Sequence, residues 1–113
     1  MKKFYKIKIE RYIKMIVVRN TLNLKFGKFK EAKPLLKEGL EINKEFGFPN
    51  ARILTDLTGE SYRIILEIEC KNMGDWENRM ANNPKAYEHF QKWYEKLVPL
   101  CEGGSREILN LVE

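Results

Sequence analysis

Tyr-Arg-Ile-Ile-Leu-Glu-Ile-Glu-Cys, residues 62–70, is the stretch that decides the fold. Side chains on a strand alternate between two faces, so positions 64, 66, 68 and 70 form one wholly apolar row. The other row is mixed, with Ile65 set among charged residues. A strand of this kind predicts helices against its dry face, and either water or a second sheet against the mixed face.

The segments before this stretch predict a strand, a helix and a hairpin. Residues 15–26 alternate in the same manner, whereas residues 29–46 carry apolar side chains at the three-and-four spacing of an amphipathic helix. Pro34 either bends that helix or starts its regular part. Residues 51–57 predict a second strand, joined to the stretch at 62–70 by a short loop that contains Gly59.

The segments after it predict two helices and a closing strand. Asp75 is expected to cap a short helix that runs to Met80, and Asn83 to cap a longer helix that has Pro84 at its first position. The two glycines at positions 103 and 104 are expected to end the longer helix. Residues 106–113 alternate again, as a final strand does.

This order of elements predicts an α+β, ferredoxin-like βαββαβ fold. It has a four-stranded antiparallel sheet, with the first and third strands in the centre and both helices on one face. We expect the row of Leu109 and Leu111 to face the helices together with the apolar rows of the central strands. The opposite face would then carry Arg19, Arg63, Ile65, Glu67, Arg106 and Ile108.

Charge and length divide the chain into a basic extension and one domain. Residues 1–14 hold 6 basic side chains against 1 acidic one, which accounts for the whole net charge of +5. This segment fits either an edge strand blunted by lysines or a loose extension. Residues 15–113 form a neutral body, long enough for one core and too short for two domains, and that neutrality argues against a nucleic-acid partner.

Several other classes of protein are excluded by what the sequence lacks. It has no secretory leader and no apolar run of the roughly 20 residues that a membrane helix needs, which argues against a membrane partner. Cys70 and Cys101 lie in apolar patterns, as free thiols of a cytoplasmic protein do. There is no phosphate loop, no zinc spacing and no nucleophile elbow, so we expect neither a metal nor a cofactor.

The mixed face of the sheet predicts a partner. Ile65, Ile108 and Val17 would stand among charges on a bare surface, which a second copy of the chain can cover. We therefore expect a homodimer formed through the sheet faces.

Several short motifs, taken together, resemble one known superfamily. They are the strand-to-glycine segment at residues 19–28, the hairpin at Thr58-Gly59, the helix opening at Asp75-Trp76-Glu77, the break at Asn82-Asn83-Pro84 and the strand at Arg106-Glu107-Ile108. Over residues 15–113 the chain resembles the dimeric α/β-barrel superfamily and is most similar to its NIPSNAP-like group. The resemblance implies a homodimer with a ligand cleft between sheet and helices in each subunit.

The resemblance leaves the activity open, because relatives include cofactor-independent monooxygenases, haem-degrading oxygenases and proteins without an assigned activity. Trp76, Phe90 and Trp93 are candidates to line a cleft for a small apolar or aromatic molecule, although their helical spacing also fits a core. Ligand binding is the main hypothesis. A monooxygenase of the antibiotic-biosynthesis or haem-degrading type is the alternative.

The polar candidates are three charged residues and one histidine. Arg63, Glu67 and Arg19 would converge either inside the cleft or at the dimer interface, where they could equally form a cross-strand ion pair. His89, the only histidine, is the one possible axial ligand for haem. Its place at the edge of an amphipathic stripe favours an ordinary boundary position instead.

Overall fold

The computed structural model describes residues 15–59 and 61–112, and the predicted edge strand at residues 1–14 lies outside these ranges. In chain order, the main elements are β1 (Ile16–Leu24), α2 (Phe29–Glu45), β2 (Arg52–Thr55), β3 (Arg63–Cys70), α3 (Met73–Glu77), α4 (Arg79–Asn82), α5 (Pro84–Leu97) and β4 (Cys101–Asn110). A 3₁₀ turn at Val98–Leu100 joins α5 to β4.

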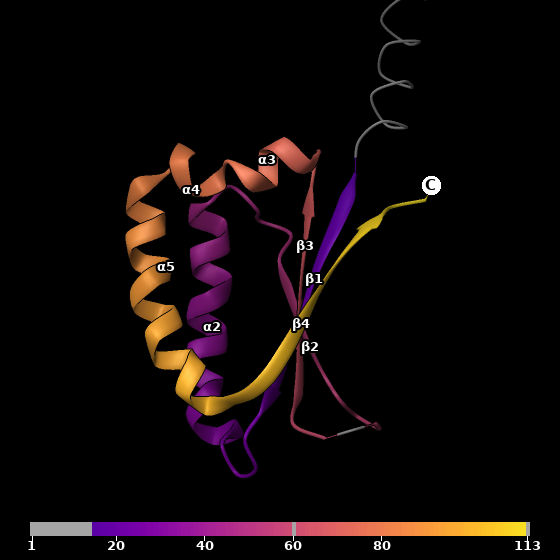
Figure 1. Ribbon diagram of the computed structural model, residues 1–113, viewed down its shortest axis with the longest axis vertical. Coiled ribbons are helices and arrows are strands. Elements are labelled where there is room, and N and C mark those ends of the chain that lie inside the picture. Colours follow the sequence, from indigo (N-terminus) through magenta and orange to yellow (C-terminus); the bar gives the residue numbers. More distant parts are fainter. Residues whose placement is uncertain (1–14, 60, 113) are drawn as a thin grey trace, which may run out of the picture.

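The four strands form one antiparallel sheet in the order β2-β3-β1-β4. Both long helices, α2 and α5, lie on the same side of it (Figure 1). The predicted ferredoxin-like arrangement is therefore confirmed, including the central position of the first and third strands.

The helix side of the sheet holds the core. Val18 of β1 lies opposite Ile68 of β3, and both are buried, as predicted for the apolar rows of these strands. From the helices, Ile42, Trp93 and Leu97 form a buried cluster.

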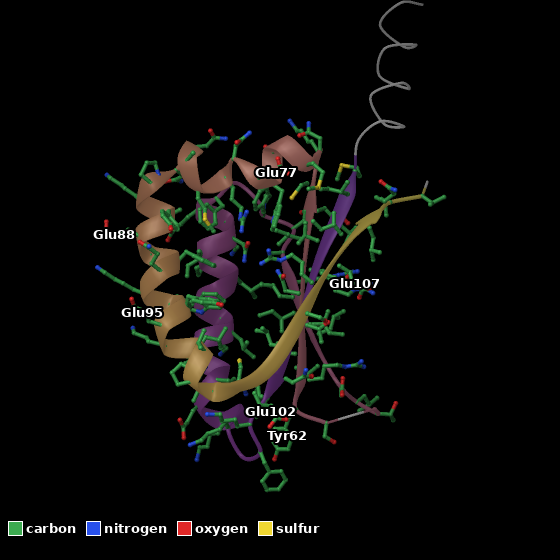
Figure 2. The ribbon with its side chains drawn as sticks, viewed as in Figure 1. Tyr62, Glu77, Glu88, Glu95, Glu102 and Glu107 are labelled. Carbon is green, nitrogen blue, oxygen red and sulfur yellow. The ribbon has the colours of Figure 1, made fainter. Side chains whose placement is uncertain are left out.

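The orientation predicted for β4 was wrong. Residues that lie opposite one another in an antiparallel pair share a face, and the partners of Val18 and Asn20 are Ile108 and Arg106. Ile108 and Arg106 therefore face the helices, and Leu109 with its alternate neighbours faces outward. Figure 2 shows Glu107, in this outward row, on the far side of β4 from the helices.

The ends of the helices follow local chemistry, with two departures from prediction. Asn83 accepts a hydrogen bond from the Ala86 amide at 3.2 Å, with Pro84 at the first helical position, as predicted. The short helix is capped by Asn72 rather than Asp75, since the Asn72 side chain accepts from the Asp75 amide at 2.8 Å.

The second departure concerns the glycines at positions 103 and 104, which lie within β4 and do not end a helix. Helix α2 runs unbroken through Pro34, so the regular part of that helix does not begin there.

Candidate functional site

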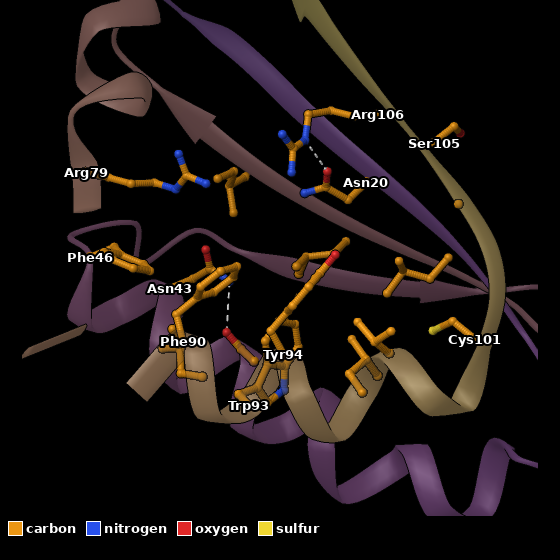
Figure 3. Close-up of a pocket in the computed structure, with 18 of the residues that line it drawn as sticks. Asn20, Asn43, Phe46, Arg79, Phe90, Trp93, Tyr94, Cys101, Ser105 and Arg106 are labelled. Atoms are coloured by element: carbon orange, nitrogen blue, oxygen red, sulfur yellow. Dashed lines mark hydrogen bonds between the residues drawn. The ribbon is translucent and has the colours of Figure 1, made fainter. Parts of the chain in front are cut away.

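A cavity of about 440 Å³ lies between the helix side of the sheet and the two long helices. This volume is in the range of small-molecule sites, roughly 300–1,000 Å³. One wall is aromatic and the opposite end is polar (Figure 3). The aromatic wall comprises Phe46, Phe90, Trp93 and Tyr94, with Asn43 beside it. The polar end comprises Asn20, Arg79, Ser105 and Arg106, and the ring of Trp76 lies against its two arginines.

The aromatic wall is built mainly by α5, where spacings of three and four residues place three rings on one face. Phe90 lies 5.7 Å from Trp93 and 5.7 Å from Tyr94 between ring centroids, and it stacks on the Tyr94 ring at 22°. Phe46, at the end of α2, meets Phe90 edge-on at 6.2 Å. Tyr94 lines the cavity and is 53% exposed.

Trp93 is fixed in place by helix α2. Its indole Nε1 donates a hydrogen bond to the Leu35 carbonyl at 2.6 Å, and the side chain is buried. A Cβ atom at Gly39 would lie 3.0 Å from Trp93 Cζ2, so a side chain at that position would crowd the ring. The glycine on α2 thus makes room for the tryptophan on α5.

Hydrogen bonds hold the polar side chains of the cavity in position. The Arg106 Nε group of β4 donates to Asn20 Oδ1 of β1 at 2.7 Å. Arg79 Nη1 donates to the Trp76 carbonyl at 2.8 Å. Asn43 Nδ2 donates to the Gly39 carbonyl at 2.8 Å, which leaves its oxygen free to accept.

The electrostatic character of the cavity is positive. No aspartate or glutamate is among the lining residues in the part of the chain that the structure describes. Burial lowers the pKa of Arg79 from its usual value, and the charge of Arg106 lowers that pKa further. Even so, an arginine stays protonated at neutral pH.

The two thiols are poor nucleophiles. Burial raises the pKa of Cys70 to about 11, and the charge of Asp75 acts in the same direction. Burial also raises the pKa of Cys101, which lines the cavity. Since the thiolate is the reactive form, neither group is activated for attack on a ligand at neutral pH. Both cysteines are free, as the sequence predicted.

The structure divides the predicted site residues between two faces. Trp76, Phe90 and Trp93 line the cavity. Arg19 and Glu67 lie on the outer face of the sheet, where Arg19 Nη2 and Glu67 Oε2 are 3.3 Å apart in a cross-strand ion pair. Arg63 lies in the same outward row as Glu67, and its ion pair is with Asp56, at 2.9 Å.

His89 is outside the cavity, and the suggested haem ligand is not supported. Its Nδ1 atom lies 2.9 Å from Glu45 Oε1, and its Nε2 atom lies 3.0 Å from Glu38 Oε1. Both ring nitrogens are thus engaged by carboxylates of α2. The boundary position favoured by the sequence is the one observed.

The described residues lack a metal cluster and a membrane-spanning helix. Residues 15–59 and 61–112 contain no group of three or more His, Cys, Asp or Glu side chains placed to hold a metal ion. In the same ranges no helix has the length and apolar character needed to cross a membrane.

Sequence reasoning missed the two arginines of the cavity. Arg79 follows Trp76 by three residues, the spacing at which side chains meet on a helical turn, so the sequence itself indicated that the arginine lies beside the tryptophan. Arg106 was assigned to the outer face because the row of Leu109 and Leu111 is the more apolar one. Its true position follows only from the pairing of β4 with β1.

Comparison with solved structures places this fold among known proteins. A NIPSNAP family protein of unknown function from Agrobacterium tumefaciens matches with a TM-score of 0.75 at 19% sequence identity, over 89% of this chain and 91% of that one. The chain has the NIPSNAP-like fold. The resemblance predicted from the sequence is thereby confirmed at the level of fold.

Other solved structures match over a similar length. An uncharacterised NIPSNAP-like domain protein from Burkholderia xenovorans has a TM-score of 0.73 at 17% identity, over 88% of this chain and 87% of that one. A candidate antibiotic biosynthesis monooxygenase from Caulobacter crescentus has a TM-score of 0.70 at 19% identity, over 90% and 93%. The sequence matches no family model and no curated protein.

Proposed function

We propose that this protein binds a small aromatic molecule in the cavity between its sheet and its two long helices. The observation that carries the proposal is the combination of an aromatic wall with a few fixed polar groups around about 440 Å³ of space. Small-molecule sites have this character, because apolar contact supplies affinity and a few polar groups set orientation.

The apolar surface that a ligand buries in the cavity sets the scale of its affinity. A naphthalene-sized ligand that buries about 200 Å² of apolar surface gains about 5 kcal/mol, from which the entropic cost of association is subtracted, so we expect weak binding. N-phenylnaphthylamine, a neutral dye that fluoresces in apolar surroundings, is a suitable probe. We expect it to bind with one site per chain.

Filling the mouth of the cavity tests the location. Val98 lines the cavity and is 46% exposed, so Val98→Trp should occupy the opening without disturbing the core. We expect this variant to bind the dye at least about tenfold more weakly. Val112→Trp makes the same change at a position that is 90% exposed and outside the cavity, and should bind normally. Equal binding by both variants would place the dye elsewhere and contradict the proposal.

The proposal includes a homodimer formed through the outer face of the sheet. In the described residues no helix covers this face, and its apolar side chains include Leu109, which is 37% exposed, and Leu111, which is 40% exposed. The observed orientation of β4 brings Leu109 to this face beside Val17 and Ile65 and takes Ile108 away from it. Leu111 continues the row of Leu109, and its amide donates to the Met15 carbonyl.

Charges on the outer face also favour a second copy as the partner. Glu67 is 4% exposed and lies between Arg19 and Arg52, at 3.3 and 3.2 Å. Arg19 Nε is buried without a hydrogen-bond partner among the described residues. A face that carries both signs of charge can complement itself across a two-fold axis. Sedimentation of the wild-type protein as a monomer at micromolar concentration would refute the dimer.

A monooxygenase activity is the second candidate, and the fold shared with the Caulobacter protein is the observation that favours it. Oxygen uptake on addition of an aromatic quinol would support it. Binding of the dye together with an absence of oxygen uptake would favour a binding protein. The free, unactivated thiols fit the reducing cytoplasm in which we place the protein.

A further inference from the structure

Two cations share one tryptophan at the polar end of the cavity. The Cζ atom of Arg79 lies 4.2 Å from the centroid of the Trp76 ring, and the Cζ atom of Arg106 lies 4.8 Å from it. These arginines come from α4 and β4, which are remote in the sequence. Figure 3 shows the two side chains directed toward each other, across the cavity from Phe90 and Tyr94.

Each guanidinium is held in position and still has donors to spare. Arg79 uses one N–H on the Trp76 carbonyl, and Arg106 uses Nε–H on Asn20. A guanidinium has five N–H donors, so each retains several for another acceptor. Among the described residues, neither arginine forms a salt bridge.

Placing two like charges beside one ring has an electrostatic cost. Attraction to the face of the indole offsets part of it, by about 0.5–2 kcal/mol for each cation. The repulsion between the cations remains, and partial burial reduces the screening by water. The lowered pKa of Arg79 has burial as its first cause and Arg106 as its second, which agrees with an uncompensated positive site.

We propose that the ligand carries a carboxylate, which binds between Arg79 and Arg106 while its aromatic body lies against the rings of α5. This inference rests on the proposed binding function and narrows the ligand to an aromatic acid. A carboxylate matches the planar fork of a guanidinium and accepts two hydrogen bonds from it. It also supplies the negative charge that the described lining residues lack.

Competition between two ligands of one shape tests the inference. Naphthoate and naphthamide share a ring system and differ in the charge of the head group. Each is titrated against bound N-phenylnaphthylamine, whose fluorescence reports displacement. We expect naphthoate to compete about tenfold more strongly than naphthamide with the wild-type protein, because charge-assisted hydrogen bonds are stronger than neutral ones.

Removing either cation should remove this preference. Arg79→Gln and Arg106→Gln keep a polar side chain without the charge, and each should weaken naphthoate roughly tenfold while naphthamide changes little. Lys92→Gln is the matched control. It loses one positive charge from a side chain that is 71% exposed on the outer surface of α5, and should retain the preference.

The outcomes separate the two proposals. Equal competition by naphthoate and naphthamide overturns the carboxylate inference and leaves the cavity as a site for neutral aromatics. Absence of dye binding to the wild type overturns both. Loss of dye binding by both Arg→Gln variants would indicate that the arginines support the wall of the cavity. Arg106→Lys, which keeps the positive charge, then decides the matter. If it binds the dye but shows no preference for naphthoate over naphthamide, the inference fails.

Discussion

His89 joins the two long helices through a pair of carboxylates. It lies on α5, and its partners Glu38 and Glu45 lie on α2, one at each ring nitrogen. The hydrogen bond to Glu45 is the main cause that raises the pKa of His89 above its usual value of 6.5, and partial burial opposes that rise only in part. The protonated imidazole is thus the form that this arrangement favours.

The raised pKa of His89 determines how the stability of the protein changes with pH. The folded state binds the proton more tightly than the unfolded state, so the stabilisation is complete below about pH 6.5 and is lost as pH rises through the raised pKa of the folded state. We expect wild type to exceed His89→Gln in free energy of unfolding at about pH 6, and the gap to shrink at about pH 9. Urea denaturation of both proteins at the two pH values measures it. A gap that widens with pH would contradict the assignment.

The sequence predicted the boundary location of His89 but not its two carboxylate partners. A histidine at the edge of an amphipathic stripe is expected near a boundary. Glu38 and Glu45 precede it by 51 and 44 residues. Only the packing of α5 on α2 brings these groups together, and no local pattern encodes that contact.

The contact between α2 and α5 depends on a glycine. Gly39 lies on α2 under the indole of Trp93, where a Cβ atom would be 3.0 Å from the ring. The hydrogen bond from Trp93 to the Leu35 carbonyl restricts how far the ring can move away. Close packing of this kind leaves little space for added atoms.

Gly39→Val should therefore destabilise the protein despite the poor helix propensity of glycine. Overpacking costs about 1–3 kcal/mol, which exceeds the few tenths gained by replacing glycine with valine in a helix. Chemical denaturation should show the loss. Lys37→Val, at an exposed position of the same helix, should change stability by about 0.5 kcal/mol or less. A stabilised Gly39→Val protein would mean that the indole can shift.

Strand β4 shows why the sequence was misleading for one element. Gly104 pairs with Leu22, and a Cβ atom there would lie 2.8 Å from the Thr21 carbonyl, so the glycine serves a close approach of two strands. From sequence, the same glycine has the usual signature of a helix end. The two rows of β4 each contain apolar residues, and alternation alone could not decide between them. By contrast, the wholly apolar row of β3 was assigned correctly.

The whole molecule is a two-layer structure with one covered sheet face and one open face in the described residues. A layer architecture is stable when each sheet face with apolar character finds a partner. Ile65 lies near the middle of the open face, opposite Thr21 on one side and Leu54 on the other. Its position makes it the natural centre of the proposed dimer contact.

Ile65→Arg should separate the dimer without unfolding the subunit. A guanidinium buried at the centre of an interface without a partner costs about 3–5 kcal/mol, so the dimer should weaken by about a hundredfold or more. Sedimentation at micromolar concentration should then show monomers. Leu57→Arg, at a side chain that is 99% exposed in a loop, should remain dimeric. A dimeric Ile65→Arg protein would place the contact elsewhere.

The placement of the two tryptophans gives the molecule an optical property. The chain has Trp76 and Trp93 and no other tryptophan, and both border the same hollow. A ligand bound in the cavity therefore lies close to both tryptophans, and no tryptophan elsewhere adds fluorescence that is insensitive to binding. Ultraviolet-excited emission of the unlabelled protein is consequently a direct gauge of occupancy, suited to screening compound collections without any attached dye.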